Sequence, residues 1–196
     1  MNILICYAST EGQTRKIARF CARTLIAAGH SVEVLPATDA HDLALAGFDG
    51  AILAGSVHMG RLQAELGTFA RDHAAALNGM PSMLLQVSLA AAGEDAEERA
   101  DLGRIAIDFC KHAGWDPGEI HHVAGAFRFT EYDFFKGWAM RYIAARKGQK
   151  IDPGTDTEFT DWEALARILR RWRALKGTPR LAATDDDASD AEGEAL

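Results

Sequence analysis

The sequence predicts an α/β fold in which helices cover both faces of a mainly parallel sheet. Its 196 residues, 48% of them hydrophobic and 25% charged, fit a single globular domain with a core of its own. Short apolar runs alternate five times with segments of helical periodicity, which is the order of a doubly wound sheet. The first run, residues 3–7 (ILICY), lacks charged side chains, as expected of a parallel strand buried on both faces.

The amino-terminal half supplies three strands and the first helix. After residues 3–7, residues 14–28 place apolar side chains at helical spacing, and Gly29 ends that helix. Residues 31–36 (SVEVLP) alternate between polar and apolar side chains, which indicates a strand near a sheet edge. Residues 50–55 (GAILAG) are again apolar throughout and predict a third, central strand.

The carboxyl-terminal half continues the alternation. Apolar side chains three or four residues apart predict a helix over 62–77, and the run SMLLQVS predicts a strand over 82–88. A second helix is expected over 96–113 and a fifth, shorter strand over 120–126. Two tryptophans and two leucines at helical spacing mark a last helix over 162–172.

The five strands need right-handed crossovers, and ligands are expected at their carboxyl ends, near the point where the strand order reverses. Two strand orders satisfy this pattern. Residues 127–157 are too long for a simple connection, so we interpret them as an insert. We expect a folded domain over 1–176 and an acidic, disordered tail over 177–196. Residues 185–196 contain six acids and no base, which leaves a charge of −1 on the rest of a chain of net charge −7.

Several functional classes are excluded by composition. No apolar run is long enough to cross a membrane, and the start of the chain lacks the basic region of a signal peptide. The three cysteines show no metal-binding spacing and are expected to be buried in a reducing compartment. His121 and His122 are adjacent, so they face opposite sides of a strand and no metal site is expected.

The segment between the first strand and the first helix has the features of a phosphate-binding loop. Backbone N–H groups at the start of a helix bind anions, and hydroxyl side chains add donors. The dinucleotide fingerprint GxGxxG is absent, and the near match to a triphosphate loop at 55–62 lacks the lysine and the hydroxyl. A simple helix-capping turn is the alternative. The candidate residues are Ser9, Thr10, Glu11, Gly12, Gln13 and Thr14.

The loop Ser-Thr-x-Gly-Gln-Thr after a strand resembles the FMN phosphate loop of the flavodoxin superfamily. A wider resemblance, to the flavodoxin-like, quinone-dependent protoporphyrinogen IX dehydrogenases of bacterial haem synthesis, rests on five segments in order. They are YASTEGQTRKIA (7–18), GSVHMGRL (55–62), NGMPSMLLQVSL (78–89), AGAFRF (124–129) and TDWEAL (160–165). The resemblance covers residues 2–176 and implies a five-stranded sheet in the order 2-1-3-4-5 with FMN as cofactor.

The same resemblance implies that the loops after the third and fourth strands flank the flavin ring. The expected ring-binding residues are Ser56, Val57, His58, Met59, Gly60, Ser88, Leu89 and Ala90. None of them is aromatic, which leaves a flavin face open to a flat substrate. Arg61 and Arg128 are candidates for binding the substrate's propionates, while a solvent-exposed cation is the alternative for Arg61. No catalytic residue is assigned.

The insert has an unusual composition. Residues 127–142 hold seven of the sixteen aromatic side chains, and residues 134–150 hold five cations and no acid. This composition is typical of a segment at a membrane surface. A lid that packs on its own sheet and an RNA-binding segment are the alternatives.

The resemblance implies an enzyme that oxidises protoporphyrinogen IX with FMN and passes the electrons to a membrane quinone. We expect a cytoplasmic protein held at the inner membrane through 127–150, with no nucleic acid as partner; a homo-oligomer is compatible with the sequence. Two alternatives remain. A flavodoxin-type electron carrier usually has a strongly acidic body and aromatic residues on the flavin, which this chain lacks. A soluble FMN quinone reductase is the other.

Overall fold

The computed structural model describes residues 1–127 and 157–174. Five parallel strands form its centre in the order β2-β1-β3-β5-β6, which confirms the predicted α/β fold with strand order 2-1-3-4-5. Continuous registers join β1 to both β2 and β3, β3 to β5 and β5 to β6. The strands are β1 (Asn2–Ala8), β2 (Ser31–Pro36), β3 (Gly50–His58), β5 (Ser82–Ser88) and β6 (Glu119–Ala124).

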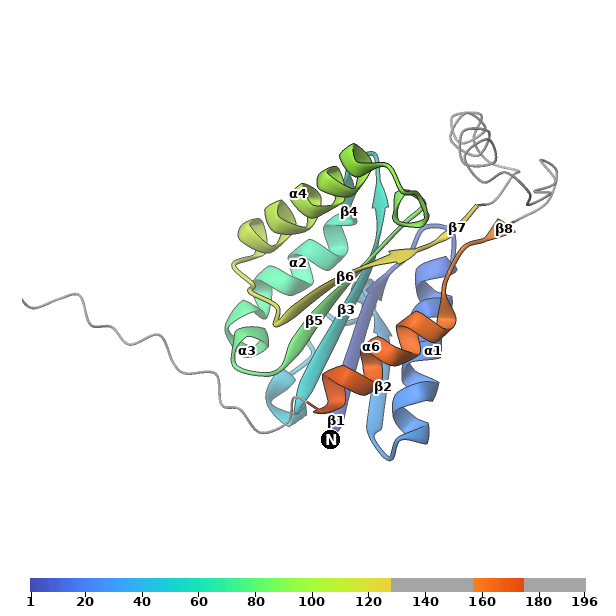
Figure 1. The fold of residues 1–196 in the computed structure, drawn as a ribbon. Coiled ribbons are helices and arrows are strands. Elements are labelled where there is room, and N and C mark those ends of the chain that lie inside the picture. The colour runs from blue at the N-terminus through green and yellow to red at the C-terminus, as the bar shows by residue number, and fades with distance from the viewer. Residues whose placement is uncertain (128–156, 175–196) are drawn as a thin grey trace, which may run out of the picture.

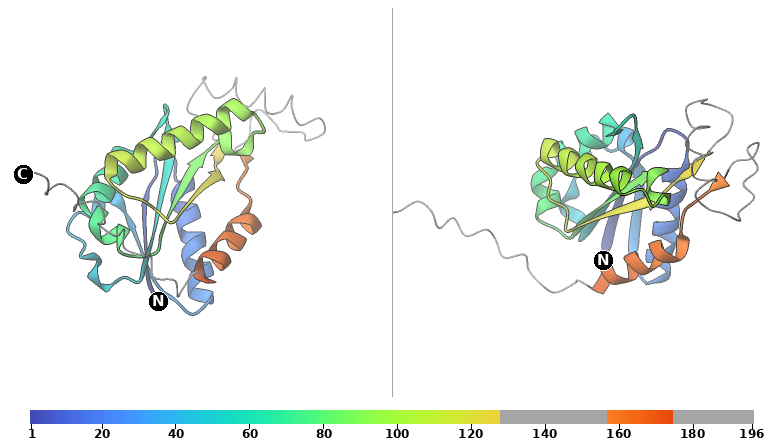
Figure 2. Two further views of the ribbon diagram at one scale, coloured as in Figure 1. Left: turned by 60° about the vertical axis from the view of Figure 1, so that its left-hand side comes forward. Right: turned by 45° about the horizontal axis from the view of Figure 1, so that its top comes forward.

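Helices cover both faces of the sheet (Figures 1 and 2). Alternate residues of β1 divide between two cores: Ile3 and Ile5 pack toward α1 and α6, and Leu4 and Cys6 toward α2 and α4. Because every one of these side chains is fully buried, the sheet is covered on both sides, as the continuous apolar runs predict. The helices are α1 (Gln13–Ala27), α2 (Ala64–Asp72), α3 (Ala74–Asn78), α4 (Ala96–Ala113) and α6 (Trp162–Ala174).

The helix α4 shows how local sequence sets its ends. Asp95 directly precedes the first turn, and its carboxylate accepts hydrogen bonds from the backbone N–H groups of Glu97 (2.8 Å) and Glu98 (3.1 Å) in that turn. Gly114 closes the helix in the left-handed conformation, with φ of 64°. An acidic cap at the start and a glycine at the end are the signals that define a helix in a sequence, and α4 occupies the predicted range 96–113.

The predicted loop after the third strand is instead a β-hairpin. β3 continues to His58 and pairs antiparallel with β4 (Arg61–Leu62). The two turn residues, Met59 and Gly60, have φ of 48° and 75°. Positive φ at both positions matches the right-handed twist of the flanking strands, so a two-residue turn is enough to reverse the chain.

Two other predicted elements also differ from the structure. The helix expected over 62–77 is interrupted at His73, whose φ of −111° leaves the helical range, so α2 and α3 are separate. The fifth strand ends at Ala124, two residues before the predicted end, and the backbone N–H of Gly125 makes the last bond to β5, to the carbonyl of Ser88 (3.0 Å).

Beyond Gly125, β7 (Ala126–Phe127) pairs antiparallel with β8 (Thr157–Glu158). This two-stranded ribbon joins the two ends of the segment that was predicted to be an insert; the segment itself lies outside the described residues. No described helix is long and apolar enough to cross a membrane. Three short 3₁₀ helices complete the connections: η1 (Ala37–Asp39), η2 (Leu45–Gly47) and η3 (Ala90–Ala92).

Candidate functional site

A pocket lies at the carboxyl ends of β1, β3, β5 and β6, the edge at which a doubly wound sheet binds ligands. It contains about 490 Å³ of empty space, counted out to open solvent. β3 and β5 contribute their last residues to it, and β1 and β6 contribute the residues that follow them. Its lining is Ser9, Glu11, Gln13, Thr14, Ser56, Val57, His58, Val87, Ser88, Leu89, Gly125 and Ala126.

The loop between β1 and α1 forms one end of this pocket. Ser9 Oγ accepts a hydrogen bond from the backbone N–H of Gly12 (3.0 Å), and Gly12 has φ of 88°, which permits the tight turn. No side chain caps α1, and no acid stands in its first turn. The N–H groups at the start of the helix are therefore available for an anionic ligand.

Thr14 carries a distinctive feature of the pocket. Its side chain is only 1% exposed, yet its hydroxyl has no hydrogen-bond partner among the described residues. A buried hydroxyl without a partner is costly, so native proteins usually satisfy it. Thr14 lines the pocket at the start of α1, so its hydroxyl is placed to donate a hydrogen bond to an anionic ligand.

His58 and Glu11 meet at the pocket from its two loops. His58 Nε2 lies 3.7 Å from Glu11 Oε1, and both side chains are partly buried. Glu11 belongs to the loop after β1 and His58 is the last residue of β3, so this contact joins the two loops that flank the pocket. The imidazole also places a second proton-binding group beside the carboxylate.

A hydrogen-bond network behind the pocket also joins the two loops. The side-chain amide of Gln63 donates hydrogen bonds to Ser56 Oγ and to Thr10 Oγ1, the latter at 3.4 Å. Gln63 stands just before α2, so it fixes the loop after β1 against the end of β3. A second, polar hollow lies on this side of the loop, with about 1,220 Å³ of empty space counted out to open solvent. Tyr7, Ala8, Ser9, Thr10, Glu11, Gly12, Arg15, Pro36, Ala37, Thr38, Gln63 and Glu65 line it.

The far wall of the pocket comes from the ends of β5 and β6. Ser88 Oγ accepts a hydrogen bond from the backbone N–H of Ala91 (3.1 Å), which fixes the turn into η3. A Cβ atom on Gly125 would lie 3.3 Å from Val87 Cγ1. Glycine at position 125 therefore allows β6 and the end of β5 to approach closely at the pocket wall.

Hydrogen bonds from the first turn of α1 connect the pocket to the residues that follow the predicted insert. Gln13 Nε2 donates a hydrogen bond to Thr160 Oγ1 (2.9 Å), and Thr160 Oγ1 donates to the carbonyl of Ala124 (2.7 Å). Thr160 is 8% exposed, so both bonds are shielded from water. One hydroxyl thus links the first turn of α1, the end of β6 and the segment before α6.

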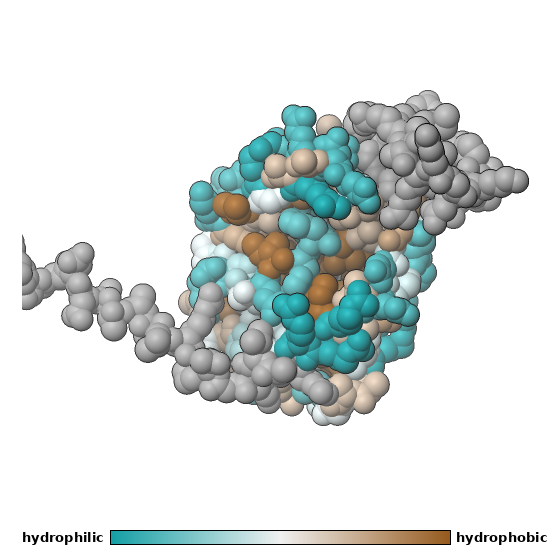
Figure 3. Space-filling view, viewed as in Figure 1, coloured by the Kyte–Doolittle hydropathy of each residue, from teal (hydrophilic) through white to brown (hydrophobic). Residues whose placement is uncertain are grey.

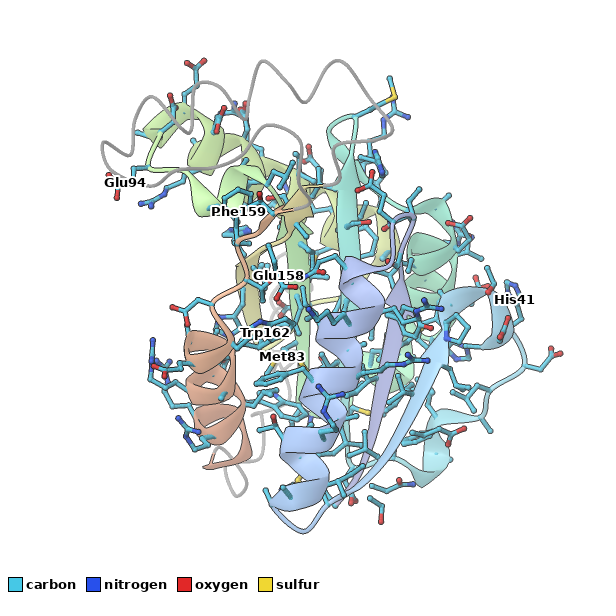
Figure 4. All side chains as sticks on the ribbon, turned by 90° about the vertical axis from the view of Figure 1, so that its right-hand side faces the viewer. His41, Met83, Glu94, Glu158, Phe159 and Trp162 are labelled. Carbon is cyan, nitrogen blue, oxygen red and sulfur yellow. The ribbon has the colours of Figure 1, made fainter. Side chains whose placement is uncertain are left out.

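A second set of contacts strengthens this attachment. Lys16 forms an ion pair with Glu158 and lies over the ring of Trp162, 5.4 Å from its centroid. The indole N–H of Trp162 donates to the other oxygen of Glu158 (2.7 Å), and its ring packs on Phe20 with centroids 4.8 Å apart. Figure 4 looks onto these side chains, with Glu158, Phe159 and Trp162 labelled between α1 and α6.

The structure brings most of the predicted ring and phosphate residues to one pocket, but not all. Thr10 and Gly12 line the neighbouring hollow. Met59 and Gly60 form the hairpin turn, where Met59 is 98% exposed, and Ala90 lies in η3 outside the lining. Arg61 is exposed on β4. Arg128, the other predicted substrate residue, lies outside the described residues.

Four residues of the site escape the sequence analysis: Gln63, Val87, Gly125 and Ala126. Gln63 acts on Thr10 from 53 positions away, a contact that no local pattern indicates. Val87 lies near the carboxyl end of the predicted strand 82–88, and this position is the sequence signal that could have assigned it to the pocket. Gly125 and Ala126 are the last two residues of the predicted strand 120–126, which in the structure ends at Ala124.

The remaining titratable candidates lie apart from the pocket. His121 Nε2 contacts Glu119 Oε2 at 2.6 Å on β6, while burial and the neighbouring His121 lower the pKa of His122. No cluster of His, Cys, Asp or Glu suited to a metal ion occurs within 1–127 and 157–174. Cys6, Cys21 and Cys110 are buried and unpaired, as predicted.

Comparison with known proteins adds a family to this fold. A family model described as "Flavodoxin domain" matches residues 4–153. Two solved structures from Bacillus cereus share the fold. Flavodoxin 1 has a TM-score of 0.55 at 16% identity, over 90% of this chain and 100% of that chain. Flavodoxin 2 has a TM-score of 0.52 at 18% identity, over 89% of this chain and 99% of that chain.

Two relatives with a named activity are similar along most of their length. The protoporphyrinogen IX dehydrogenase (quinone) of Escherichia coli strain K12 is 28% identical over 182 residues, which cover 92% of this chain and 99% of the relative. A Leishmania major protein of the same name is 27% identical over 173 residues, covering 88% of this chain and 74% of the relative. The similarity therefore extends well beyond the loop after β1.

Proposed function

The chain belongs to the flavodoxin domain family, and on this premise we propose that it is an FMN-dependent oxidoreductase. Its proposed reaction oxidises protoporphyrinogen IX to protoporphyrin IX and passes the electrons to a membrane quinone. One observation carries the proposal: relatives named for this reaction match 92% and 88% of the chain. The oxidation removes six electrons and six protons from the macrocycle in three two-electron steps, and three quinones take them up as quinols.

The residues at the pocket fit FMN rather than a larger dinucleotide. The unpartnered hydroxyl of Thr14, the uncapped start of α1 and the loop at Ser9 form a donor set for a phosphate without a cation. We assign the ring to the wall made by the ends of β3 and β5, from Ser56 and Ser88 onward. Bound FMN supplies the two-electron chemistry, and the protein supplies binding and orientation.

We assign the substrate to the open side of the same pocket. Protoporphyrinogen IX carries two propionates, and a cation near the pocket stabilises them by charge-assisted hydrogen bonds. Arg61 pairs with His58 across the β3–β4 hairpin, so it stands at the pocket's edge. Arg128 follows β7 directly and is the second candidate. Contact with the membrane is assigned to residues 127–150, as their composition predicts.

The test is a direct assay of the purified holoenzyme without oxygen. Protoporphyrinogen IX is added with and without a quinone, and porphyrin fluorescence is followed over time. We expect turnover that needs the quinone and produces one porphyrin for three quinols. The apo protein serves as the control for oxidation without enzyme.

Two outcomes would overturn the proposed reaction. Oxidation of a nicotinamide cofactor with reduction of the quinone, but none of porphyrinogen, would identify a soluble quinone reductase. Bound FMN that exchanges electrons with redox proteins only, with no porphyrin formed, would identify an electron carrier.

A further inference from the structure

The helices α1 and α6 carry a one-sided excess of positive charge. They lie side by side on one face of the sheet, in contact through Phe20 and Trp162 (Figure 4). α1 contains no acidic residue, and α6 contains Glu163 alone. The exposed cations of the two helices, which we call the basic face, are Arg15, Lys16, Arg19, Arg23, Arg167, Arg170 and Arg171.

The basic face is almost without counter-charges. Within the described residues, Lys16 is its one member with an ion pair, to Glu158. On the opposite side of the sheet, α4 carries both signs of charge, and Arg104 pairs with Asp101 one turn away. Among the described helices compared, the excess of cations is therefore found on α1 and α6 and not on α4.

The chain supplies a counter-charge directly beyond this surface. α6 ends at Ala174, and residues 185–196 carry six acids and no base. Ten residues lie between them, and a chain of that length reaches at most about 35 Å when fully extended. The helix α6, with 13 residues, is about 20 Å long. The acidic segment therefore reaches either helix without crossing the sheet.

We propose that the acidic segment 185–196 docks on the basic face and shields its cations from external anionic partners. Covalent linkage raises the effective concentration of the acids to the millimolar range, which favours this contact over an equally charged free molecule. The contact is electrostatic between exposed groups, so it weakens as salt shortens the screening length. No exposed aromatic side chain lies on α1 or on the described part of α6, which disfavours single-stranded nucleic acid as the occupant.

A spin label in the tail tests the contact in the full-length holoenzyme. The described cysteines are all buried, and burial raises the pKa of Cys6 and Cys21 to about 12 and of Cys110 to about 11, so a cysteine at Ser189→Cys is labelled selectively. At about 0.01 M salt, where the screening length is about 30 Å, we expect the label to broaden amide signals of α1 and α6 and to spare α4. At about 1 M salt, where that length is about 3 Å, the broadening disappears.

Charge variants make the test specific. Arg19→Gln, Arg23→Gln and Arg170→Gln together remove three exposed cations of the basic face and are expected to abolish the broadening. A control on the other face, Arg104→Gln with Lys111→Gln on α4, removes two cations and is expected to leave the broadening unchanged. Absence of broadening at low salt, or broadening equal over α4 and α1, would overturn the docking.

The shielding is tested separately with vesicles of phosphatidylcholine and phosphatidylglycerol. Replacing the six acids of residues 185–196 by their amides is expected to raise the fraction of protein bound to these vesicles several-fold. Vesicles of phosphatidylcholine alone are the control and should show no such change. Unchanged binding to the anionic vesicles would overturn the shielding, because docked acids would then not compete with the lipid.

Discussion

At the scale of single residues, Thr14 tests the proposed phosphate site most directly. Thr14→Val keeps the side-chain shape and removes the hydroxyl that has no partner in the described protein. We expect FMN affinity to fall by about 1–3 kcal/mol, which is about a 5- to 150-fold rise in Kd. The thermal stability of the apo protein should not fall, because the variant no longer buries an unsatisfied polar group. Quenching of FMN fluorescence and thermal unfolding of the apo protein measure the two effects.

A second threonine on the same helix gives the control. Thr24 Oγ1 bonds to the carbonyl of Phe20 (3.0 Å) and lies away from the pocket lining. Thr24→Val should therefore leave FMN affinity unchanged. If Thr14→Val binds FMN as tightly as Thr24→Val does, the hydroxyl of Thr14 is no phosphate ligand.

The buried thiols make a prediction about alkaline pH. Burial raises the pKa of Cys6 and Cys21 from 9.0 to about 12, and that of Cys110 to about 11. A raised pKa in the folded state favours the protonated form, so this stabilisation is complete below pH 9 and is lost as the pH rises toward 11–12. We expect urea midpoints to fall above pH 9 and iodoacetamide to modify no thiol of the native protein near neutral pH. Rapid modification of native protein, detected by mass spectrometry, would contradict this burial.

Residue patterns indicate the site only where its parts are local. The loop from Ser9 to Thr14 is predictable, because hydroxyls, a glycine and a helix start follow one another in the sequence. The roles of Gln63 and Thr160 are not predictable in this way. Gln63 contacts Thr10, which is 53 residues away in the sequence. Thr160 contacts Gln13, 147 residues away, and the backbone carbonyl of Ala124. Long-range polar contacts of this kind leave no periodic signal.

At the scale of elements, the β3–β4 hairpin has a turn residue that fits it poorly. Met59 has φ of 48° and is 98% exposed, so its side chain offsets little of the cost of the left-handed conformation. That cost is about 1 kcal/mol for a residue with a Cβ atom. Met59→Asn creates the Asn-Gly pair that this turn type prefers and should stabilise the protein by up to about 1 kcal/mol. Urea unfolding measures the gain. Met59→Ala, which keeps the strain, should show none, and an equal gain in both variants would exclude the turn as the cause.

The junction around Thr160 is the element that joins α1 to the base of the predicted insert. Thr160→Val removes the acceptor for Gln13 and the donor to the carbonyl of Ala124. We expect a loss of about 1–3 kcal/mol in the free energy of unfolding, because the hydroxyl is buried and both partners lose their bonds. FMN affinity should fall as well, since Gln13 lines the pocket. Thr160→Ser keeps the hydroxyl and should restore both quantities; equal losses in the two variants would point to packing instead.

The elements also show where periodicity is a sufficient signal. β5 and α4 have the predicted bounds, because a continuous apolar run and a capped helix carry their own limits. The helix expected over 62–77 instead divides at His73. The helical spacing of apolar side chains continues across this short break, so the spacing alone does not reveal it. The hairpin was predicted as a loop because His-Met-Gly-Arg lacks the usual turn pair.

At the scale of the whole molecule, the strand order decides where chemistry can occur. β1 lies between β2 and β3, and the helices that follow β1 and β3, α1 and α2, cover opposite faces of the sheet. The chain therefore leaves these two strands in opposite directions, and the pocket lies at this point. Figure 3 shows apolar residues exposed in patches between polar ones, on the side of the molecule seen in Figure 1. The order 2-1-3-4-5 could not be fixed from alternation alone and was implied by the resemblance to the flavodoxin-like dehydrogenases.

The whole chain offers one more test, in which the predicted insert is removed. Phe127 pairs with Thr157, so the two ends of residues 128–156 are adjacent and an Asn-Gly turn can join them. The pocket lining lies outside the removed segment, and we therefore expect the sheet to fold and FMN to bind with unchanged affinity. Porphyrinogen oxidation and binding to anionic vesicles should both fall sharply. In one preparation, flavin absorbance measures FMN binding, porphyrin fluorescence measures oxidation and vesicle sedimentation measures binding to the vesicles.

A full-length control separates charge from the rest of the insert. Replacing the five cations of residues 134–150, Lys136, Arg141, Arg146, Lys147 and Lys150, by glutamine removes about 1 kcal/mol of attraction each at an anionic surface. This variant should lose vesicle binding and keep oxidation with a water-soluble quinone, because the insert's aromatic residues are still present. A shortened protein that keeps FMN, full porphyrinogen turnover and vesicle affinity would show that neither activity needs the insert. That result would remove the proposed membrane role of residues 127–150. It would not support the electron-carrier alternative, because porphyrinogen turnover would persist.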